Sequence, residues 1–137
     1  MKIIQGNIFT STCQTTVNTV NCVGVMGAGI ALEFKLRYPD MFTKYQMLCE
    51  QQQIATGKLW LYKNEAKWVL NFPTKQHWKY PSKLEYLEQG LDKFMRSYQE
   101  RGIQSIAFPV LGAAKGGLSE DKVLQLMESY LKDCTIP

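Results

Sequence analysis

The sequence contains a single histidine, His77, and none of its four cysteines is paired in a Cys-x-x-Cys motif. Structural zinc sites use four closely spaced ligands of these types, so we expect no metal and no cofactor. The first residues lack the long apolar region of a secretory signal. No apolar run approaches the roughly 20 residues that span a bilayer. We therefore predict a cytoplasmic protein with reduced thiols and no membrane contact.

Several common catalytic and nucleotide-binding motifs are also missing. Neither glycine-rich segment has the Gly-Lys-Ser/Thr ending of a Walker A loop or the Gly-x-Gly-x-x-Gly order of the dinucleotide fingerprint. The chain has 137 residues with 45% hydrophobic content, which suits one domain with one substantial core. Its net charge of +4 suits an anionic ligand without requiring one.

Strand-like and helix-like segments alternate along the chain. The expected strands are residues 2–5, 15–20, 59–62, 68–74 and 105–110, and the expected helices are 27–37, one from Asp40, one from Ser82 to Gly102 and one from Ser119. We expect Asp40, Ser82 and Ser119 to act as N-caps, Ser82 within a capping box with Glu85. This alternation predicts an α/β domain with a mostly parallel or mixed sheet.

Polar and glycine residues interrupt the chain where two expected strands end. Asn18 and Asn21 come at the end of strand 15–20 and precede Gly24, Gly27 and Gly29. Asparagine amides are able to bind a sugar hydroxyl, and glycine turns ahead of helices are able to bind phosphate. A second glycine-rich turn, 112–117, also follows a strand and precedes a helix. The spacing alone supports a phosphate-bearing ligand, although Asn18 and the glycines would equally serve an ordinary turn.

These segments together resemble a known family. The stretches "GNIF", "VNTVNCVGVMGAGIALEFK" and "PVLGAAKGGLS" occur in the order and spacing of the macrodomain, a module that binds ADP-ribose. Together with "NFPTKQHW", these stretches are most similar in sequence to the macrodomains of DarG antitoxins. The resemblance implies a three-layer α/β/α fold with a mixed central sheet. It also implies one domain over residues 1–137, a final strand that would follow "KDCTIP", and a longer antitoxin of which this would be the N-terminal part.

The resemblance implies a role in ADP-ribose binding for most of the polar and glycine residues noted above. Asn7 replaces an aspartate that usually binds the adenine amino group, Ile8 would cover the adenine, and Asn21 would reach the distal ribose. The first phosphate loop would comprise Val25, Met26, Gly27, Ala28 and Gly29. The second would comprise Leu111, Gly112, Ala113, Ala114, Lys115, Gly116, Gly117 and Leu118.

By the same resemblance, Lys75 is the catalytic lysine, together with Asn21. A neutral lysine amine is able to attack the anomeric carbon of a ribose or its opened aldehyde, and a charged one is able to move protons. The sequence leaves both roles open. Without the resemblance, Lys75 would be taken for an ordinary solvated lysine.

His77, Trp78 and Lys79 follow the lysine and form, with Tyr80, a basic and aromatic group. Aromatic rings stack on unpaired bases and lysines neutralise phosphates, so the group predicts contact with single-stranded nucleic acid. Packing of Trp78 and Tyr80 over the core is the competing interpretation. The predicted function is removal of ADP-ribose from thymidine in single-stranded DNA by a monomer, reversing a DarT-type toxin. Release of ADP-ribose from protein glutamate and non-catalytic ADP-ribose binding are the alternatives.

Overall fold

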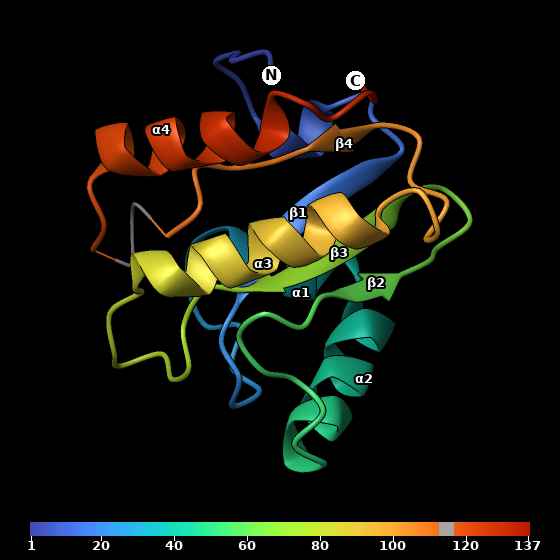
Figure 1. Cartoon of the computed structure of the whole chain (residues 1–137). Helices are drawn as coiled ribbons and strands as arrows, with labels where there is room; N and C mark the ends of the chain where they lie inside the picture. Colours follow the sequence, from blue (N-terminus) through green and yellow to red (C-terminus); the bar gives the residue numbers. More distant parts are fainter. Residues whose placement is uncertain (113–116) are drawn as a thin grey trace.

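The computed structural model, shown in Figure 1, describes residues 1–112 and 117–137. The elements that it assigns are a 3₁₀ turn (Ile8–Thr10), four strands and four helices: β1 (Thr15–Val20), α1 (Gly29–Arg37), α2 (Pro39–Glu50), β2 (Trp60–Tyr62), β3 (Trp68–Pro73), α3 (Leu84–Ser97), β4 (Ile106–Ala107) and α4 (Glu120–Leu131).

The strands form one mixed sheet in the order β2-β3-β1-β4. The central strand β1 runs parallel to both β3 and β4, and β2 pairs antiparallel with β3. Threonine and valine dominate β1, as expected for a strand buried on both faces. Because β1, β3 and β4 are parallel, their carboxyl ends lie at the same edge of the sheet, where ligands of open α/β sheets bind.

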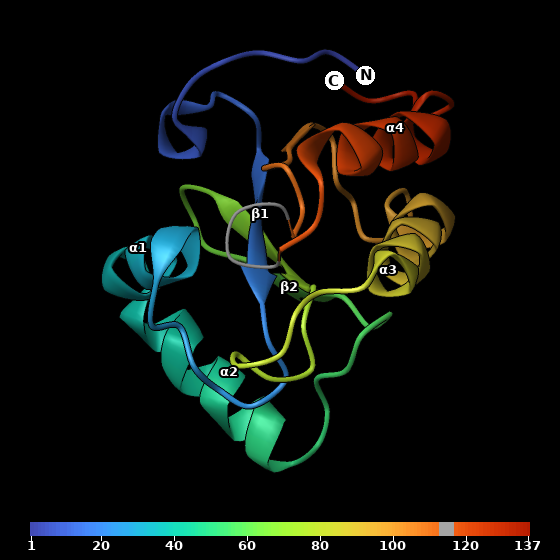
Figure 2. The same cartoon turned by 90° about the vertical axis from the view of Figure 1, so that its left-hand side faces the viewer.

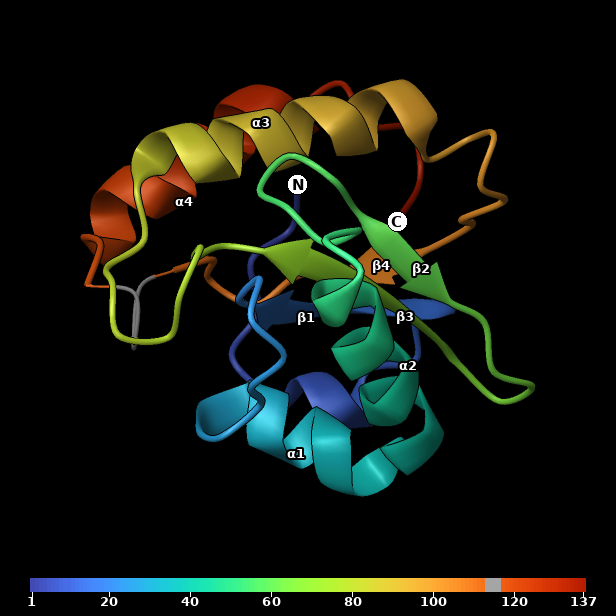
Figure 3. The ribbon, with the colours of Figure 1, turned by 90° about the horizontal axis from the view of Figure 1, so that it is seen from below.

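Two helices cover each face of the sheet. Figure 2 shows α1 and α2 on one side and α3 and α4 on the other, and Figure 3 shows the same three layers from below. Alternate residues of β3 enter opposite cores: Leu70 and Phe72 pack in the α3/α4 layer, and Val69 packs in the α1/α2 layer. The predicted three-layer α/β/α fold with a mixed sheet is thus confirmed.

Three local expectations were wrong, and a fourth was right only in position. Residues 2–5 form no strand, since this exposed segment has no strand partner among the described residues. Helix α2 begins at Pro39 after Tyr38, so Asp40 lies inside the first turn instead of capping it. Helix α3 begins after Lys83, and Ser82 is buried beside Gly112 instead of forming a capping box. Ser119 does occupy the N-cap of α4, but its side chain makes no capping hydrogen bond to a described residue.

Candidate active site

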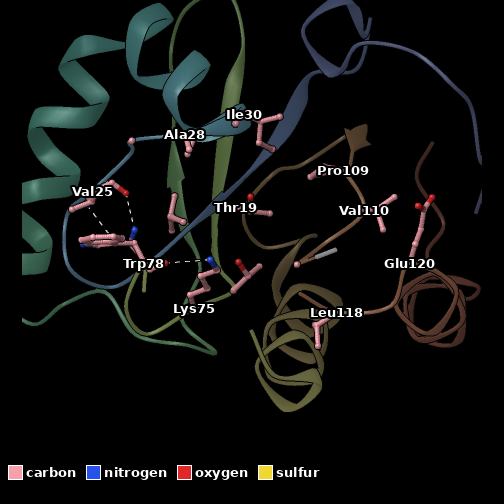
Figure 4. Close-up of a pocket in the computed structure, with 17 residues that line it drawn as sticks. Thr19, Val25, Ala28, Ile30, Lys75, Trp78, Pro109, Val110, Leu118 and Glu120 are labelled. Atoms are coloured by element: carbon pink, nitrogen blue, oxygen red, sulfur yellow. Dashed lines mark hydrogen bonds between the residues drawn. The ribbon is translucent and has the colours of Figure 1, made fainter. Parts of the chain in front are cut away.

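A pocket of about 980 Å³ opens at the carboxyl ends of the parallel strands (Figure 4). Its size lies in the range of small-molecule sites. Each of the three parallel strands is followed by residues that line it. The lining residues are Thr19, Val20, Asn21, Val25, Gly27, Ala28, Gly29, Ile30, Ala31, Thr74, Lys75, Trp78, Pro109, Val110, Gly112, Leu118 and Glu120.

The first glycine turn is held in shape by the side chain of Asn21. Its Nδ2 donates to the carbonyl of Val25 (2.7 Å), and its Oδ1 accepts from the backbone N–H of Val23 (3.0 Å). Gly24 has φ +85°, a conformation that favours glycine. The amide of Asn21 therefore fixes the loop that leads into α1.

A buried tyrosine on α2 contacts the residue that holds this loop. The hydroxyl of Tyr45 lies 2.7 Å from the carbonyl oxygen of Asn21 and 2.8 Å from its Oδ1. Tyr45 is fully buried, and burial is the main cause that raises its pKa, followed by the nearby Cys49. The phenol therefore stays protonated and acts as a donor to Asn21.

The N-terminus of α1 faces the same pocket. Gly29, Ile30 and Ala31 line it, and the first N–H groups of a helix have no intrahelical acceptor. No acidic residue stands in this first turn. The helix end is therefore suited to binding an anion such as a diphosphate.

The described ends of the second glycine turn are Gly112, Gly117 and Leu118, of which Gly112 and Leu118 line the pocket and Gly117 does not. The N–H of Leu118 donates to the carbonyl of Gly112 (3.2 Å), which closes the turn. Gly112 has φ +67°, and a Cβ there would meet Leu118 and Ser82 at 3.1 to 3.3 Å. Residue 112 is therefore restricted to glycine by both conformation and space.

Lys75 follows β3 directly and lines the pocket, as its position after the strand predicts. Its Nζ lies 3.4 Å from the carbonyl oxygen of Trp78, and Figure 4 draws this contact. Its own carbonyl accepts from the thiol of Cys22 (3.4 Å). The lysine is thus held between the loop after β3 and the loop after β1, with its amine at the pocket.

The four residues His77, Trp78, Lys79 and Tyr80, here called the 77–80 cluster, lie beside Lys75. The ring of His77 is 5.5 Å from that of Trp78 and 5.1 Å from that of Tyr80, centroid to centroid. Trp78 and Tyr80 are 50% and 61% exposed, so neither is a core residue. Packing over the core therefore does not explain this cluster.

Other predicted site residues lie away from the pocket lining. Asn18 is fully buried in β1, where its Nδ2 donates to Oδ1 of Asn71 (3.1 Å). Successive side chains of a strand point to opposite faces of the sheet, and this places the side chain of Asn18 in the α1/α2 layer. Asn21, by contrast, comes after the strand has ended. Met26 and Leu111 are also buried outside the lining.

The predicted adenine-binding residues are placed in the N-terminal segment. The side chain of Asn7 accepts from the N–H of Phe9 (2.9 Å) and caps the 3₁₀ turn that contains Ile8. Neither residue belongs to the pocket lining. Ala113, Ala114, Lys115 and Gly116 lie outside the described residues.

Among the residues near the site that the sequence did not single out, Tyr45 and Glu120 bear most on its chemistry. Tyr45 appears in the sequence only as one apolar position of a helix, because its contact with Asn21 is a tertiary one. Glu120 lines the pocket at the start of α4. Figure 4 shows Glu120 across the pocket from Lys75. An acidic residue in the first turn of a helix is common, so nothing in the sequence marked it.

The thiol of Cys22 is half-buried beside Lys75, and its pKa is raised to about 11, mainly by burial and secondarily by Cys49. Such a thiol stays neutral at physiological pH and is a poor nucleophile, in keeping with its sequence interpretation as a small buried residue.

This raised pKa gives a testable pH dependence. The folded state favours the protonated thiol, so its stabilising effect is complete below the ordinary thiol pKa of 9.0 and is lost as pH rises from there to about 11. We expect the wild-type chain to lose on the order of 1 kcal/mol more unfolding free energy over this interval than Cys22→Ser, whose hydroxyl does not ionise. Urea unfolding at pH 8 and pH 10.5 measures the difference, and equal losses would contradict the assignment.

Within residues 1–112 and 117–137, no group of three or more His, Cys, Asp or Glu side chains is arranged to hold a metal ion. In the same part of the chain, none of the helices combines the length and apolar character needed to cross a membrane.

Comparison with known proteins identifies relatives of this site. The family model described as "Macro domain" matches residues 17–127. A protein of Thermus aquaticus named "DNA ADP-ribosyl glycohydrolase" is 40% identical over 136 residues, which cover 96% of this chain and 38% of that protein. The chain thus spans little more than a third of this curated relative.

Two solved structures are also similar. The "Macrodomain of Mycobacterium tuberculosis DarG" has a TM-score of 0.90 and 43% identity, over 93% of this chain and 87% of that chain. "Thermosipho africanus DarTG in complex with ADP-ribose" has a TM-score of 0.92 and 39% identity, over 96% of this chain and 38% of that chain.

Proposed function

The chain belongs to the Macro domain family, and from this premise we propose that it removes ADP-ribose from thymidine bases of single-stranded DNA. The observation that carries the proposal is the amine of Lys75 at a pocket bounded by two glycine turns. The name of the Thermus aquaticus relative, "DNA ADP-ribosyl glycohydrolase", supports it at 40% identity. Since the chain spans 38% of that relative, the activity, substrate and partners are all part of the proposal.

The pocket has groups for each part of an ADP-ribosyl substrate. The N-terminus of α1 and the two glycine turns would bind the diphosphate. Asn21, whose Nδ2 has a second N–H beside the one given to Val25, would bind a hydroxyl of the distal ribose. Asn7 and Ile8 would approach the adenine, and Lys75 would lie next to the anomeric carbon.

The reaction breaks the bond between that anomeric carbon and a thymine ring nitrogen. Water supplies the new C–O bond, and the thymine nitrogen takes up a proton as the base leaves. The transition state carries positive charge on the sugar. Lys75 would contribute in one of two ways: by moving protons between a ribose hydroxyl, water and the leaving base, or by attacking the anomeric carbon itself.

The two roles of Lys75 are distinguishable. If its Nζ displaces thymine and forms an imine with the opened sugar aldehyde, water later hydrolyses the imine and regenerates the lysine. Cyanoborohydride would reduce that imine to a stable amine. Because water leaves as the imine forms and reduction adds two hydrogens, Lys75 would gain the mass of ADP-ribose less one oxygen. A reduced adduct found by peptide mass spectrometry supports the nucleophile, and full turnover without any adduct supports proton transfer.

The proposed substrate is tested by offering two modified polymers to the same protein. One is an oligonucleotide that carries ADP-ribosyl-thymidine, and the other is a protein that carries ADP-ribosyl-glutamate. We expect free ADP-ribose from the oligonucleotide at a rate at least tenfold higher. Preferential release from glutamate would move the function to the protein-directed alternative, and tight ADP-ribose binding without release from either would leave a non-catalytic reader.

Tyr45→Phe tests whether the support of Asn21 matters for turnover. The substitution removes one hydroxyl from a fully buried position and leaves Asn21 with one donor fewer. We expect a loss of about 1 kcal/mol in stability and about tenfold in kcat. Urea unfolding and steady-state kinetics measure both. Met47→Leu, at an exposed position of the same helix, is the control, and an unchanged kcat in Tyr45→Phe would remove the tyrosine from the proposal.

The partner of this activity follows from its substrate. One relative, 36% identical over 156 residues, is named as a fusion of a DNA ADP-ribosyl transferase with a DNA ADP-ribosyl glycohydrolase. Its name thus pairs the transfer of ADP-ribose with its removal, and the similar structure is titled "Thermosipho africanus DarTG in complex with ADP-ribose". We propose that this chain likewise reverses the product of a DarT-type transferase and that it acts as a cytoplasmic monomer. Light scattering on the purified protein tests the oligomeric state.

A further inference from the structure

We propose that the 77–80 cluster is a second subsite, which binds an unpaired base next to the modified thymidine by stacking on Trp78. This inference rests on the proposed function and deepens it: the substrate would be a strand of several nucleotides, and the flanking base would contribute to recognition. The roles proposed above for the pocket residues all concern the ADP-ribosyl group, and none of them accounts for a neighbouring nucleotide.

The rings of the cluster pack against one another. His77 lies between its neighbours, at 5.5 Å and an interplanar angle of 29° from Trp78, and at 5.1 Å from Tyr80. Two backbone contacts fix this arrangement: the N–H of Lys79 donates to Nδ1 of His77 (3.1 Å), and the N–H of Tyr80 donates to the carbonyl of His77 (3.0 Å). The stacking surface is therefore formed before any ligand binds.

This surface is exposed where a soluble protein normally has polar residues. Trp78 is 50% exposed and Tyr80 is 61% exposed. Large aromatic side chains gathered at the rim of a pocket are typical of binding sites. A nucleic-acid base stacked on such a ring tightens binding by about five- to 150-fold.

The charges around the cluster favour a polyanion. Lys75, Lys79 and Lys83 are spaced along residues 74–84, which contain no Asp or Glu. The ammonium of Lys79 lies 5.2 Å from the ring centroid of Trp78. A phosphate that flanks a base stacked on Trp78 would therefore meet a lysine within the same segment. A modified glutamate in a protein has no flanking nucleotide, so it offers neither a base to stack on Trp78 nor a backbone phosphate for the lysines.

The cluster is joined to the reaction centre by short contacts. Trp78 lines the pocket together with Lys75, and its carbonyl is 3.4 Å from the amine of that lysine. The N–H of Cys22 donates to the carbonyl of Gln76 (3.3 Å), which ties the cluster's loop to the loop after β1. A base stacked on Trp78 would thus lie next to the thymine that leaves.

The experiment compares two oligonucleotides within each variant. Both carry one ADP-ribosyl-thymidine, flanked on both sides either by thymines or by abasic sites. We expect wild type to show about a tenfold higher kcat/KM with flanking bases, which corresponds to one stacked base. In Trp78→Ala this ratio should fall toward one, and Trp78→Phe, which keeps an aromatic ring, should retain most of it.

Using the ratio within one variant cancels any effect of Trp78 on the shape of the catalytic pocket. Oligonucleotides with a single flanking base, on the 5′ or the 3′ side, identify which neighbour stacks. A wild-type ratio near one, or a tenfold ratio retained in Trp78→Ala, would overturn the subsite. Lys132→Ala, an exposed lysine just after α4, controls for charge alone and should keep the full ratio.

A binding measurement separates failure of this inference from failure of the proposed function. If no substrate releases ADP-ribose, unmodified fluorescein-labelled oligothymidine is titrated against wild type, Trp78→Ala and Trp78→Phe by anisotropy. At least fivefold weaker binding by Trp78→Ala alone would uphold the subsite without the activity. Equal affinities would overturn it. Hydrolysis without any dependence on flanking bases would uphold the activity and overturn the subsite.

Discussion

Lys75→Ala is expected to lower the rate of ADP-ribose release at least about 10³-fold. Proton transfer by a positioned side chain contributes typically 10²–10⁴-fold, and loss of a nucleophile costs at least as much. The lysine lines the pocket at the end of β3, and its amine is one of the few ionisable groups of the lining. Single-turnover release from the modified oligonucleotide, with enzyme in excess, measures the chemical step directly.

The same variant is expected to bind free ADP-ribose almost as well as wild type, within about threefold. The anion sites proposed for the diphosphate are backbone N–H groups of α1 and the glycine turns, which the substitution leaves in place. Calorimetry with ADP-ribose measures this. Lys122→Ala, on the exposed surface of α4, is the matched control and should be fully active. Turnover by Lys75→Ala at the wild-type rate would remove the lysine from the mechanism.

A second substitution at this position separates charge from nucleophilicity. Lys75→Arg keeps the positive charge, but its guanidinium has no neutral form at working pH. Partial activity in Lys75→Arg, at 1–10% of wild type, is expected if the group acts through its charge. Activity as low as in Lys75→Ala is expected if the neutral amine attacks the sugar.

The sequence predicted those elements whose signal is local. The β-branched run Thr15–Val20 became β1, and the segment Trp68–Pro73 became β3. Because the parallel strands end at one edge, the position of Lys75 after a strand was sufficient to place it at the pocket beside Asn21.

The features that the sequence did not predict depend on tertiary partners. Residues 2–5 have the composition of a strand, but a strand needs a neighbour to pair with. Ser82 has the pattern of a capping box, but Lys83 is the N-cap, and Ser82 packs against Gly112 across the fold. Asn18 lies only three residues before Asn21. Because side chains of a strand point alternately to its two faces, the side chain of Asn18 is directed into the core.

Gly90→Ala is expected to lower the free energy of unfolding by about 2 kcal/mol, although alanine is the better helix former. A Cβ at residue 90 of α3 would lie 2.2, 2.5 and 2.9 Å from ring atoms of Phe72 in β3. Phe72 is fully buried, so its ring has no free space to move into. Overpacking of this kind costs about 1–3 kcal/mol or more, and the helix gains up to about 1 kcal/mol. Urea unfolding measures the net loss.

The clash assigned to Gly90→Ala also predicts its repair. Phe72→Leu removes the ring atoms in question, so the double variant should be less destabilised than the sum of the two single variants by more than about 1 kcal/mol. Glu88→Ala, at an exposed position of the same helix, should change stability by less than about 0.5 kcal/mol. A Gly90→Ala protein as stable as wild type would contradict the packing argument.

Since Phe72 precedes Lys75 by three residues on the chain, a displaced ring should also shift the lysine. We therefore expect kcat to fall in Gly90→Ala and to recover in part when Phe72→Leu is added.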